Sequence, residues 1–97
     1  MAEDREFEWD PAKAAANLRK HCITFNAARR VFADPFADID FDAASSYDED
    51  RYQAVGLIGG ELVTVIYTDQ GQRIRIISAR RANTHERGKY NRGQGSR

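Results

Sequence analysis

The first third of the chain carries apolar and small residues at the spacing of helices. Asp10-Pro11 is typical of a helix start, because Asp caps the first turn and a proline at the first helical position loses no hydrogen bond. The pattern predicts a helix over 11–20, with Ala14, Ala15 and Leu18 on one side. Thr24 caps a second predicted helix over 25–33, which Asp34-Pro35 ends. The buried stripe of that helix consists of Phe25, Ala28, Val31 and Phe32.

From Phe36 onward, apolar residues alternate with polar ones as they do in strands. Ile39 and Phe41 stand between aspartates, which predicts an edge strand. Three more strands are predicted over 52–58, 62–68 and 73–79. Because the joints between them are short and rich in turn residues, these three strands should form an antiparallel meander.

The remaining predicted elements are short. Phe7-Glu8-Trp9 is either a strand or a packed lead-in to the first helix. A last helix is predicted over 83–90, where Asn83 and Glu86 have the spacing of a capping box. With 97 residues, 41% of them hydrophobic and 31% charged, the chain is expected to form a single domain over 1–97. Two helices, a meander and a helix make the fold class α+β.

Composition excludes several classes of protein. The longest apolar runs are far short of the roughly 20 residues that a transmembrane helix needs, so no role in a membrane is expected. The first residues are acidic and lack an apolar segment, so no signal peptide is expected and the protein is predicted to be cytoplasmic. Cys22, the one cysteine, excludes a disulfide framework and a zinc site built from cysteines.

Charge is divided unevenly along the chain although the net charge is zero. Residues 1–50 hold 12 acids and 6 bases, and residues 51–97 hold 3 acids and 9 bases, which gives −6 and +6. Residues 71–97 alone hold eight bases against Glu86. Either the two halves neutralise each other in the fold, or the C-terminal third builds a face that binds a polyanion.

An acidic motif invites a metal interpretation that fails. Asp38, Asp40, Asp42 and Glu49 fall at positions 1, 3, 5 and 12 of a calcium-binding loop. However, Ala43 stands where the sharp turn of that loop needs glycine, and an edge strand with a charged face fits the pattern better. Two histidines 64 positions apart make only a weak metal site, so neither a metal nor a cofactor is expected.

Two groups of residues carry candidate chemistry. Lys20-His21 ends the first helix, where a cation is favourable in its own right, but His is also the side chain best suited to proton transfer near neutral pH. The last strand should place Arg73 and Arg75 on one face with Ile77, and Ile74, Ile76 and Ser78 on the other. A strand end that meets a helix start is well suited to hold an anion. The residues expected to contact phosphate or nucleic acid in this region are Arg73, Arg75, Arg80, Arg81, His85 and Lys89.

Several short motifs resemble the BrnT family, the ribonuclease toxins of a type II toxin–antitoxin system. The N-terminal ones are Phe7-Glu8-Trp9-Asp10-Pro11-x-Lys13, Asn17-Leu18-x-Lys20-His21, and Phe25 with Ala28 and Val31-Phe32-x-Asp34-Pro35. The C-terminal ones are Asp50-Arg51-Tyr52 before Gly56, Val65-x-Tyr67-Thr68, and Arg73-Ile74-Arg75-Ile76-Ile77-Ser78-Ala79-Arg80-Arg81-Ala82 with Glu86 and Tyr90. The resemblance covers about residues 7–90 in the right order.

The resemblance implies a small RelE-like fold that cleaves RNA without a metal ion. It also implies a cognate antitoxin, BrnA, with a ribbon-helix-helix module through which the complex binds its own promoter DNA. The implied catalytic set gives His21 a proton-transfer role and Lys20 a charge-stabilising one, while Arg51, Arg75 and Arg80 clamp phosphate. Glu86 or Tyr90 either takes the second proton role or only orients Arg80. An acidic segment of the antitoxin is expected to cover the basic face of residues 73–92, taken to be uncompensated within the chain.

Two departures from the family pattern bear on this site. Cys22 stands where the family usually has a glycine that would suit a left-handed helix end, so the backbone beside His21 is expected to change or to be strained by about 1 kcal/mol. Asp50 replaces a longer Glu that could position Arg51. The alternatives to an enzyme are a non-catalytic module that binds RNA or DNA with the same basic face, and a scaffold whose acidic stretch docks a partner.

Overall fold

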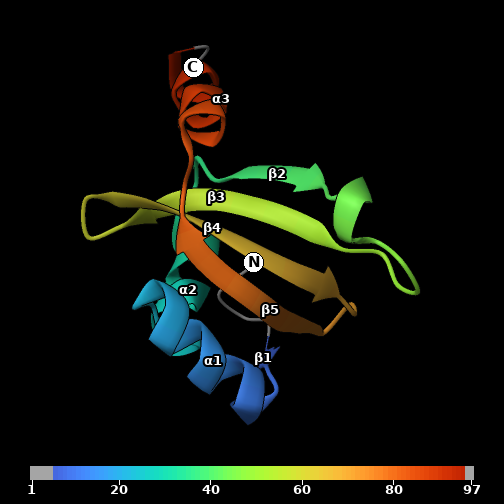
Figure 1. The fold of residues 1–97 in the computed structure, drawn as a ribbon. Coiled ribbons are helices and arrows are strands. Elements are labelled where there is room, and N and C mark those ends of the chain that lie inside the picture. Colours follow the sequence, from blue (N-terminus) through green and yellow to red (C-terminus); the bar gives the residue numbers. More distant parts are fainter. Residues whose placement is uncertain (1–5, 96–97) are drawn as a thin grey trace.

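The computed structural model describes residues 6–95, which fold into a five-stranded sheet with helices at its faces (Figure 1). The α+β class predicted from the sequence is confirmed. In chain order the elements are β1 Glu6–Glu8, α1 Pro11–His21, α2 Phe25–Ala28, the 3-10 helix η2 Arg29–Ala33, β2 Asp38–Phe41, the 3-10 helix η3 Ala43–Ser45, β3 Tyr52–Ile58, β4 Glu61–Asp69, β5 Arg73–Arg81 and α3 Thr84–Gly95. None of the described helices is long and apolar enough to cross a bilayer.

The sheet has the order β1-β5-β4-β3-β2. Neighbours from β2 to β5 are antiparallel, so the predicted meander is confirmed. Glycines with positive φ form both joints of the meander. Gly59 and Gly60 make a two-residue turn after β3, and Gly71 lies in the short turn before β5. Of the two interpretations of Phe7-Glu8-Trp9, the strand is correct for its first part, because β1 pairs in parallel with the start of β5.

The first helix begins as the sequence predicts, and its end answers the question raised by Cys22. Asp10 Oδ1 accepts a hydrogen bond of 2.8 Å from the Ala12 N–H. At the other end, Cys22 adopts the left-handed conformation with φ 60°, and its N–H donates to the Leu18 carbonyl at 2.9 Å. The glycine-like helix end is therefore kept with a cysteine in it, and His21 stays on a regular last turn.

The second predicted helix, over 25–33, is wrong in its latter half. Thr24 caps it as expected, but the α-helix ends at Ala28 and the chain continues as η2. The tighter winding lies directly on β3, where a Cβ on Gly56 would come within 2.8 Å of Val31 Cγ1. Gly56 is thus the residue that allows η2 to approach the sheet so closely.

A hydrophobic core fills the space between one face of the sheet and the segment α1–η2. Its centre includes Phe25, Val31, Val65, Ile74 and Ile76, all of which are buried. A series of ring contacts continues it along the sheet, with centroid distances of 5.4 Å for Phe7–Phe32, 4.9 Å for Phe32–Tyr67 and 5.8 Å for Tyr67–Tyr52.

The expected apolar side of α1 holds for Ala14, which packs against the core, but is wrong for Ala15, which is exposed, and for Leu18, which is 46% exposed. The inward residue is Asn17, which is buried. The physical reason is that this side of α1 faces backbone at the edge of β5, which needs a polar partner and not an apolar one.

A β-bulge in β5 changes which arginines share a face. Ser78 pairs with Ile66 and Ile76 pairs with Tyr67, so Ile77 has no partner on β4. The predicted alternation is therefore wrong beyond Ile76: Ala79 joins the core with Ile74 and Ile76. The one-residue shift moves Arg80 to the same face as Arg73 and Arg75, and away from the helices of the core.

The last helix packs on this second face, at the end of the sheet. Tyr90 lies against Val55, Ala82 and Leu62 in a second small core. The predicted capping box is confirmed, since Glu86 N–H donates to Asn83 Oδ1 at 2.8 Å and Asn83 N–H donates to Glu86 Oε1 at 2.9 Å. The helix runs five residues beyond the predicted range, to Gly95.

Candidate functional site

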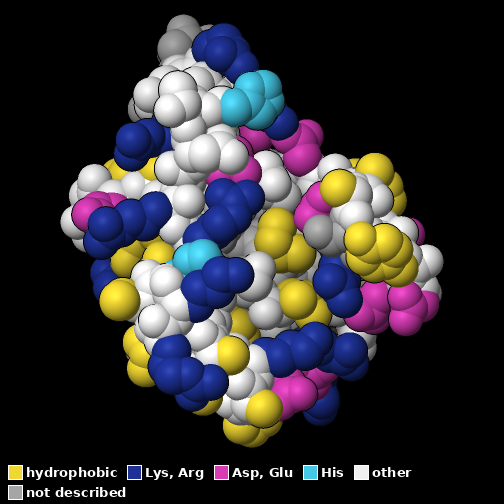
Figure 2. Space-filling model, viewed as in Figure 1, with side chains coloured by type: hydrophobic (Ala, Val, Ile, Leu, Met, Phe, Trp, Pro, Cys, Tyr) yellow, Lys and Arg dark blue, Asp and Glu magenta, His cyan; other side chains and the backbone are white. Residues whose placement is uncertain are grey.

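The candidate site is a hollow where the end of α1 meets the end of β5. It has a volume of about 380 Å³, and the residues that line it are Lys20, His21, Cys22, Arg80 and Arg81. Figure 2 shows Lys and Arg side chains gathered with a histidine over β5 and the neighbouring α1. Residues 59 positions apart in the sequence thus come together, and all but Cys22 can carry positive charge. Such a hollow is suited to an anion.

Asn17 joins the two elements that form this hollow. Its Nδ2 donates to the Ala79 carbonyl at 2.9 Å and its Oδ1 accepts from the Ala79 N–H at 3.0 Å. A further bond of 3.0 Å from Nδ2 to the Ile23 carbonyl holds the segment after the helix. Lys20 and His21 are therefore fixed beside Arg80, which follows Ala79. Sequence reasoning used Asn17 only as part of a motif, and the signal that it missed is a polar residue on the inner side of an alanine-rich helix.

Arg80 is held by a buried carboxylate on α3. Its Nη1 and Nη2 donate to the two carboxylate oxygens of Glu86, each at 2.8 Å, which is the bidentate geometry of a strong pair. Glu86 also accepts from Thr64 Oγ1 at 2.8 Å, and its side chain is only 6% exposed. The bulge makes this arrangement possible, because it sets Arg80 opposite Thr64 on the face that α3 covers.

The electrostatics of Glu86 follow from these contacts. Burial alone would raise its pKa, but hydrogen bonds from Arg80, the Asn83 N–H and Thr64 outweigh burial and lower the pKa to about 2. The same pair raises the pKa of Arg80. Glu86 is consequently a carboxylate at neutral pH whose lone pairs are already engaged, which describes a residue that orients Arg80.

Arg75 lies in a neighbouring hollow and not in the first one. That hollow, of about 360 Å³, is lined by Glu8, Trp9, Asp10, Lys13, Glu49, Arg75, Ile76 and Ile77. A third hollow of about 250 Å³ lies between the two, and it shares Lys13 and Ile77 with one and Lys20 and His21 with the other. The three together form a groove along β5 beside α1, which we call the β5 groove.

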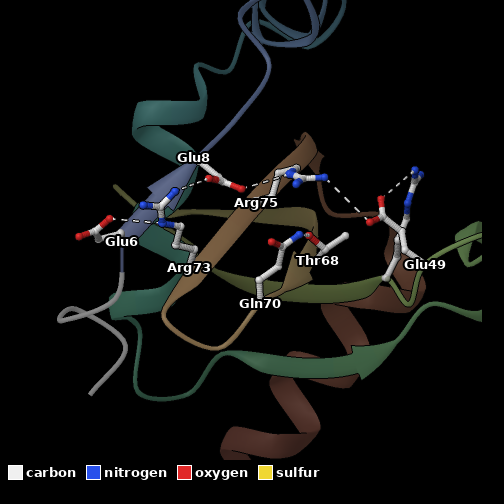
Figure 3. Close-up of polar contacts among 8 residues, drawn as sticks. Glu6, Glu8, Glu49, Thr68, Gln70, Arg73 and Arg75 are labelled. Atoms are coloured by element: carbon white, nitrogen blue, oxygen red, sulfur yellow. Dashed lines mark hydrogen bonds and ion pairs between the residues drawn. The ribbon is translucent and has the colours of Figure 1, made fainter.

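Ion pairs neutralise much of the basic face within the chain (Figure 3). Arg73 lies between Glu6, at 3.6 Å, and Glu8, at 3.2 Å. Arg75 Nε lies 3.3 Å from Glu8, and Glu49 lies 3.9 Å from both Arg75 and Arg51. Arg51 therefore has Glu49 beside it, and not the shorter Asp50. The expectation of an uncompensated basic face over 73–92 is wrong, because acids from the first half of the chain fold onto it.

The other predicted contact residues lie toward α3. Arg81 pairs with Glu61 at 3.2 Å, and Lys89 pairs with Asp40 and with Asp38, the latter at 3.6 Å. His85 is exposed on the first turn of α3. Neither His85 nor Lys89 lines the β5 groove.

Tyr90 lies apart from the groove. Its ring is 3% exposed, and its hydroxyl donates to Asp34 Oδ2 at 2.6 Å. Burial alone would raise the pKa of the Asp34 carboxyl, but the hydrogen bonds from Tyr90 and from the N–H groups of Phe36 and Leu57 outweigh burial and lower this pKa. The contacts of Tyr90 tie α3 to the turn before β2, which is a packing role.

Within residues 6–95, no group of three or more His, Cys, Asp or Glu side chains is arranged to hold a metal ion. Lys13, Lys20 and His21 have no ion-pair partner among the described residues, while the arginines of β5 do. The groove thus combines cations held in place by carboxylates with cations open to a ligand, and it contains the histidine His21.

Comparison with known proteins assigns the chain to a family. No curated protein is significantly similar to it. The family model described as the ribonuclease toxin BrnT of type II toxin–antitoxin systems matches residues 9–86, which include both ends of the β5 groove. The match covers most of the 97 residues. The chain therefore belongs to the BrnT family of ribonuclease toxins.

Proposed function

We propose that this protein is an endoribonuclease toxin that cleaves RNA without a metal ion, at the hollow formed by Lys20, His21, Arg80 and Arg81. The family carries the ribonuclease class, and a type II system implies an antitoxin partner. The observation that carries the assignment to this site is that the histidine and the cations share one hollow although they are far apart in sequence. The α+β architecture is compatible with the RelE-like fold that the sequence resemblance implies.

The chemistry of RNA cleavage makes three demands. The 2′-OH must lose a proton as it attacks the phosphorus, the extra negative charge must be stabilised, and the leaving 5′-oxygen must gain a proton. His21 exchanges one of these protons, since imidazole does so near neutral pH. Lys20 and Arg80 stabilise the charge that develops on the phosphate, as fixed cations do in a transition state.

Glu86 acts in this scheme as a positioning residue. Its carboxylate fixes the plane of the Arg80 guanidinium through two hydrogen bonds to Nη1 and Nη2, so the remaining N–H donors of Arg80 keep one direction. Arg81 lines the same hollow and adds charge for RNA binding. Arg73 and Arg75, on the same face of β5, extend this binding surface along the groove, whereas His85 and Lys89 lie outside it on α3.

The test is RNA cleavage by the purified protein with EDTA present throughout. We expect cleavage by the wild type to persist in EDTA. The rate of cleavage should fall on the order of 10²–10⁴-fold in His21→Ala and on the order of 10²–10³-fold in Arg80→Ala. Arg30→Ala, which removes an exposed arginine outside the groove, is the matched control and should cleave normally. Full cleavage by both His21→Ala and Arg80→Ala would contradict the assignment of this site, and loss of cleavage in EDTA would contradict the metal-free mechanism.

We further propose that the antitoxin is of the BrnA type, with a ribbon-helix-helix module that brings the complex to promoter DNA. In this proposal the toxin contacts RNA, and the antitoxin supplies the contacts with DNA. Co-expression with a neighbouring ribbon-helix-helix reading frame should restore growth and yield a complex that binds the promoter. A neighbouring frame of another class that neutralises the toxin would contradict this assignment.

The competing function is a module that binds nucleic acid without cutting it. The ion pairs along β5 favour neither function, because they position arginines equally well for binding. The two are separated by the fate of the RNA: a binding module protects the bound strand, whereas the proposed enzyme leaves new ends at the sites that it contacts.

A further inference from the structure

The carboxylate of Glu49 lies between two arginines at the far end of the β5 groove. Its Oε1 is 3.9 Å from Arg75 Nη1, and its Oε2 is 3.9 Å from Arg51 Nη2 (Figure 3). Glu49 comes from the segment between η3 and β3, while Arg75 belongs to β5. One anion thus bridges two guanidinium groups that separate parts of the chain bring together.

Both contacts of Glu49 are loose. A separation of 3.9 Å is too long for a hydrogen bond, in contrast to 2.8 Å for Arg80 with Glu86 and 3.3 Å for Arg75 with Glu8. The Glu49 side chain is 40% exposed, and among the described residues no hydrogen bond fixes its carboxylate. An exposed ion pair of this kind is worth little and is easily exchanged for another.

The two arginines are mounted more firmly than the acid. Arg75 is part of the central run of β5, and the Arg51 backbone N–H donates to Ser46 Oγ at 2.8 Å while its carbonyl accepts from the Asp42 N–H at 2.8 Å. The guanidinium of Arg51 is not saturated, because its buried Nε has no hydrogen-bond partner within residues 6–95. Two arginines on fixed backbones, one of them with an unsaturated donor, and a loosely held carboxylate are the features of a site that can take up a different anion.

We propose that Arg51 and Arg75 form a second phosphate-binding subsite for the RNA strand, and that Glu49 fills it in the free protein. This inference rests on the proposed ribonuclease function. An RNA phosphodiester has one negative charge and two free oxygens, as a carboxylate has, so it replaces Glu49 charge for charge. Arginine makes bidentate hydrogen bonds with phosphates as it does with carboxylates, so the two guanidinium groups can bind the phosphodiester in the same way.

The geometry of β5 sets this subsite apart from the candidate catalytic hollow. Arg75 and Arg80 share a face of the strand and lie five residues apart, which corresponds to about 15 Å along the strand. Lys13 and Lys20 line the groove between them and have no ion-pair partner among the described side chains. The RNA backbone therefore follows a path with a cation at each stage, and Glu49 competes with it only at the far end.

The test measures binding of a 2′-O-methyl oligoribonucleotide, which cannot be cleaved, by fluorescence anisotropy at low salt. We expect Glu49→Gln to bind about two- to fivefold more tightly than the wild type, because the competing charge is gone. Asp48→Asn is the matched control: it makes the same change of charge one residue away, where no ion pair is formed with any described residue, and should have a much smaller effect. In the Arg51→Gln/Arg75→Gln background, adding Glu49→Gln should change the affinity little.

Several outcomes would overturn the subsite. These are an equal gain from Asp48→Asn, a gain from Glu49→Gln that persists without the two arginines, or no binding of the oligonucleotide by the wild type. The proposed function fails separately: if unmodified RNA is bound but not cut, and the Glu49→Gln gain is present, the subsite stands without the nuclease. If RNA is cut and the gain is absent, the nuclease stands without the subsite.

Discussion

The side chain of Asn17 pairs with both backbone polar groups of Ala79. Its amide accepts from the Ala79 N–H and donates to the Ala79 carbonyl, as a residue of an adjacent strand would do. β1 ends its pairing with β5 at Arg75, so beyond that point no strand within residues 6–95 pairs with this edge of the sheet. One asparagine on a helix replaces the missing strand at the residue just before Arg80.

Replacement of Asn17 by Ala should destabilise the protein by about 2–4 kcal/mol. The substitution leaves the buried N–H and carbonyl of Ala79 without partners, and each unsatisfied group costs roughly 1–3 kcal/mol. The measurement is the free energy of unfolding in urea. Asn26→Ala, at an exposed position on α2, is the control and should change the stability little. Equal effects of the two substitutions would show that the paired amide is not what stabilises this edge.

Glu86 should make the stability of the protein depend on pH in acid. A carboxyl whose pKa is lowered to about 2 in the fold stabilises the folded state at pH values above its unfolded pKa of about 4.3. That contribution, about 2–3 kcal/mol at neutral pH, is lost as the pH falls from about 4.3 toward 2. Unfolding free energies of the wild type and Glu86→Gln should therefore differ at pH 7 and converge near pH 2. A difference that stays constant over this range would contradict the lowered pKa.

Cys22→Gly should stabilise the protein by about 0.5–1 kcal/mol. Cys22 is the only non-glycine residue with positive φ in the described part of the chain, and glycine adopts that conformation without steric cost. Thermal unfolding of Cys22→Gly and Cys22→Ala separates this effect from loss of the thiol, because alanine keeps the strain. If both variants gain stability equally, the thiol and not the backbone is responsible. The exposed thiol of the wild type should also react fully with a thiol reagent in the folded state.

Tyr90→Phe should lower stability and leave RNA cleavage intact. The hydroxyl of Tyr90 donates to the charged carboxylate of Asp34, and loss of such a bond costs about 1.5–3 kcal/mol. Because this contact lies outside the β5 groove, the rate of cleavage by the folded variant should be unchanged. Tyr47→Phe, at a side chain that is 85% exposed, is the control for stability. A large loss of cleavage in a stably folded Tyr90→Phe variant would show that the hydroxyl takes part in the cleavage reaction.

Local signals allowed the sequence to predict most of the elements. The caps at Asp10 and Thr24, the box at Asn83 and the joints of the meander act within a few residues, and the structure has all of them. The predictions fail where distant segments decide. The split of the second helix depends on close contact with Gly56, and the pairing of β1 joins residues that are more than 60 positions apart.

The candidate site was predictable in part for the same reason. Motifs identified Lys20, His21 and Arg80, and the structure gathers them in one hollow. Alternation alone put Arg80 out of phase with Arg75, since a bulge leaves no local signature in an apolar run such as Ile76-Ile77. Nor does charge counting reveal the carboxylates that fold onto the arginines, because Glu8 and Glu49 lie far from Arg75 in the chain.

The unpaired residue Ile77 shifts the alternation of side chains along β5 by one position. Upstream of it, the odd-numbered positions Arg73 and Arg75 lie on the face away from the core; downstream, the even-numbered position Arg80 does. If Ile77 were instead paired with β4 as an ordinary residue of the strand, Arg80 would turn into the apolar layer and Ala79 toward Glu86, although no side chain would be changed. The bulge therefore sets the faces of this strand, and a one-residue deletion at Ile77 should leave Ala79 in the core and Arg80 opposite Thr64, because the shortened strand alternates regularly.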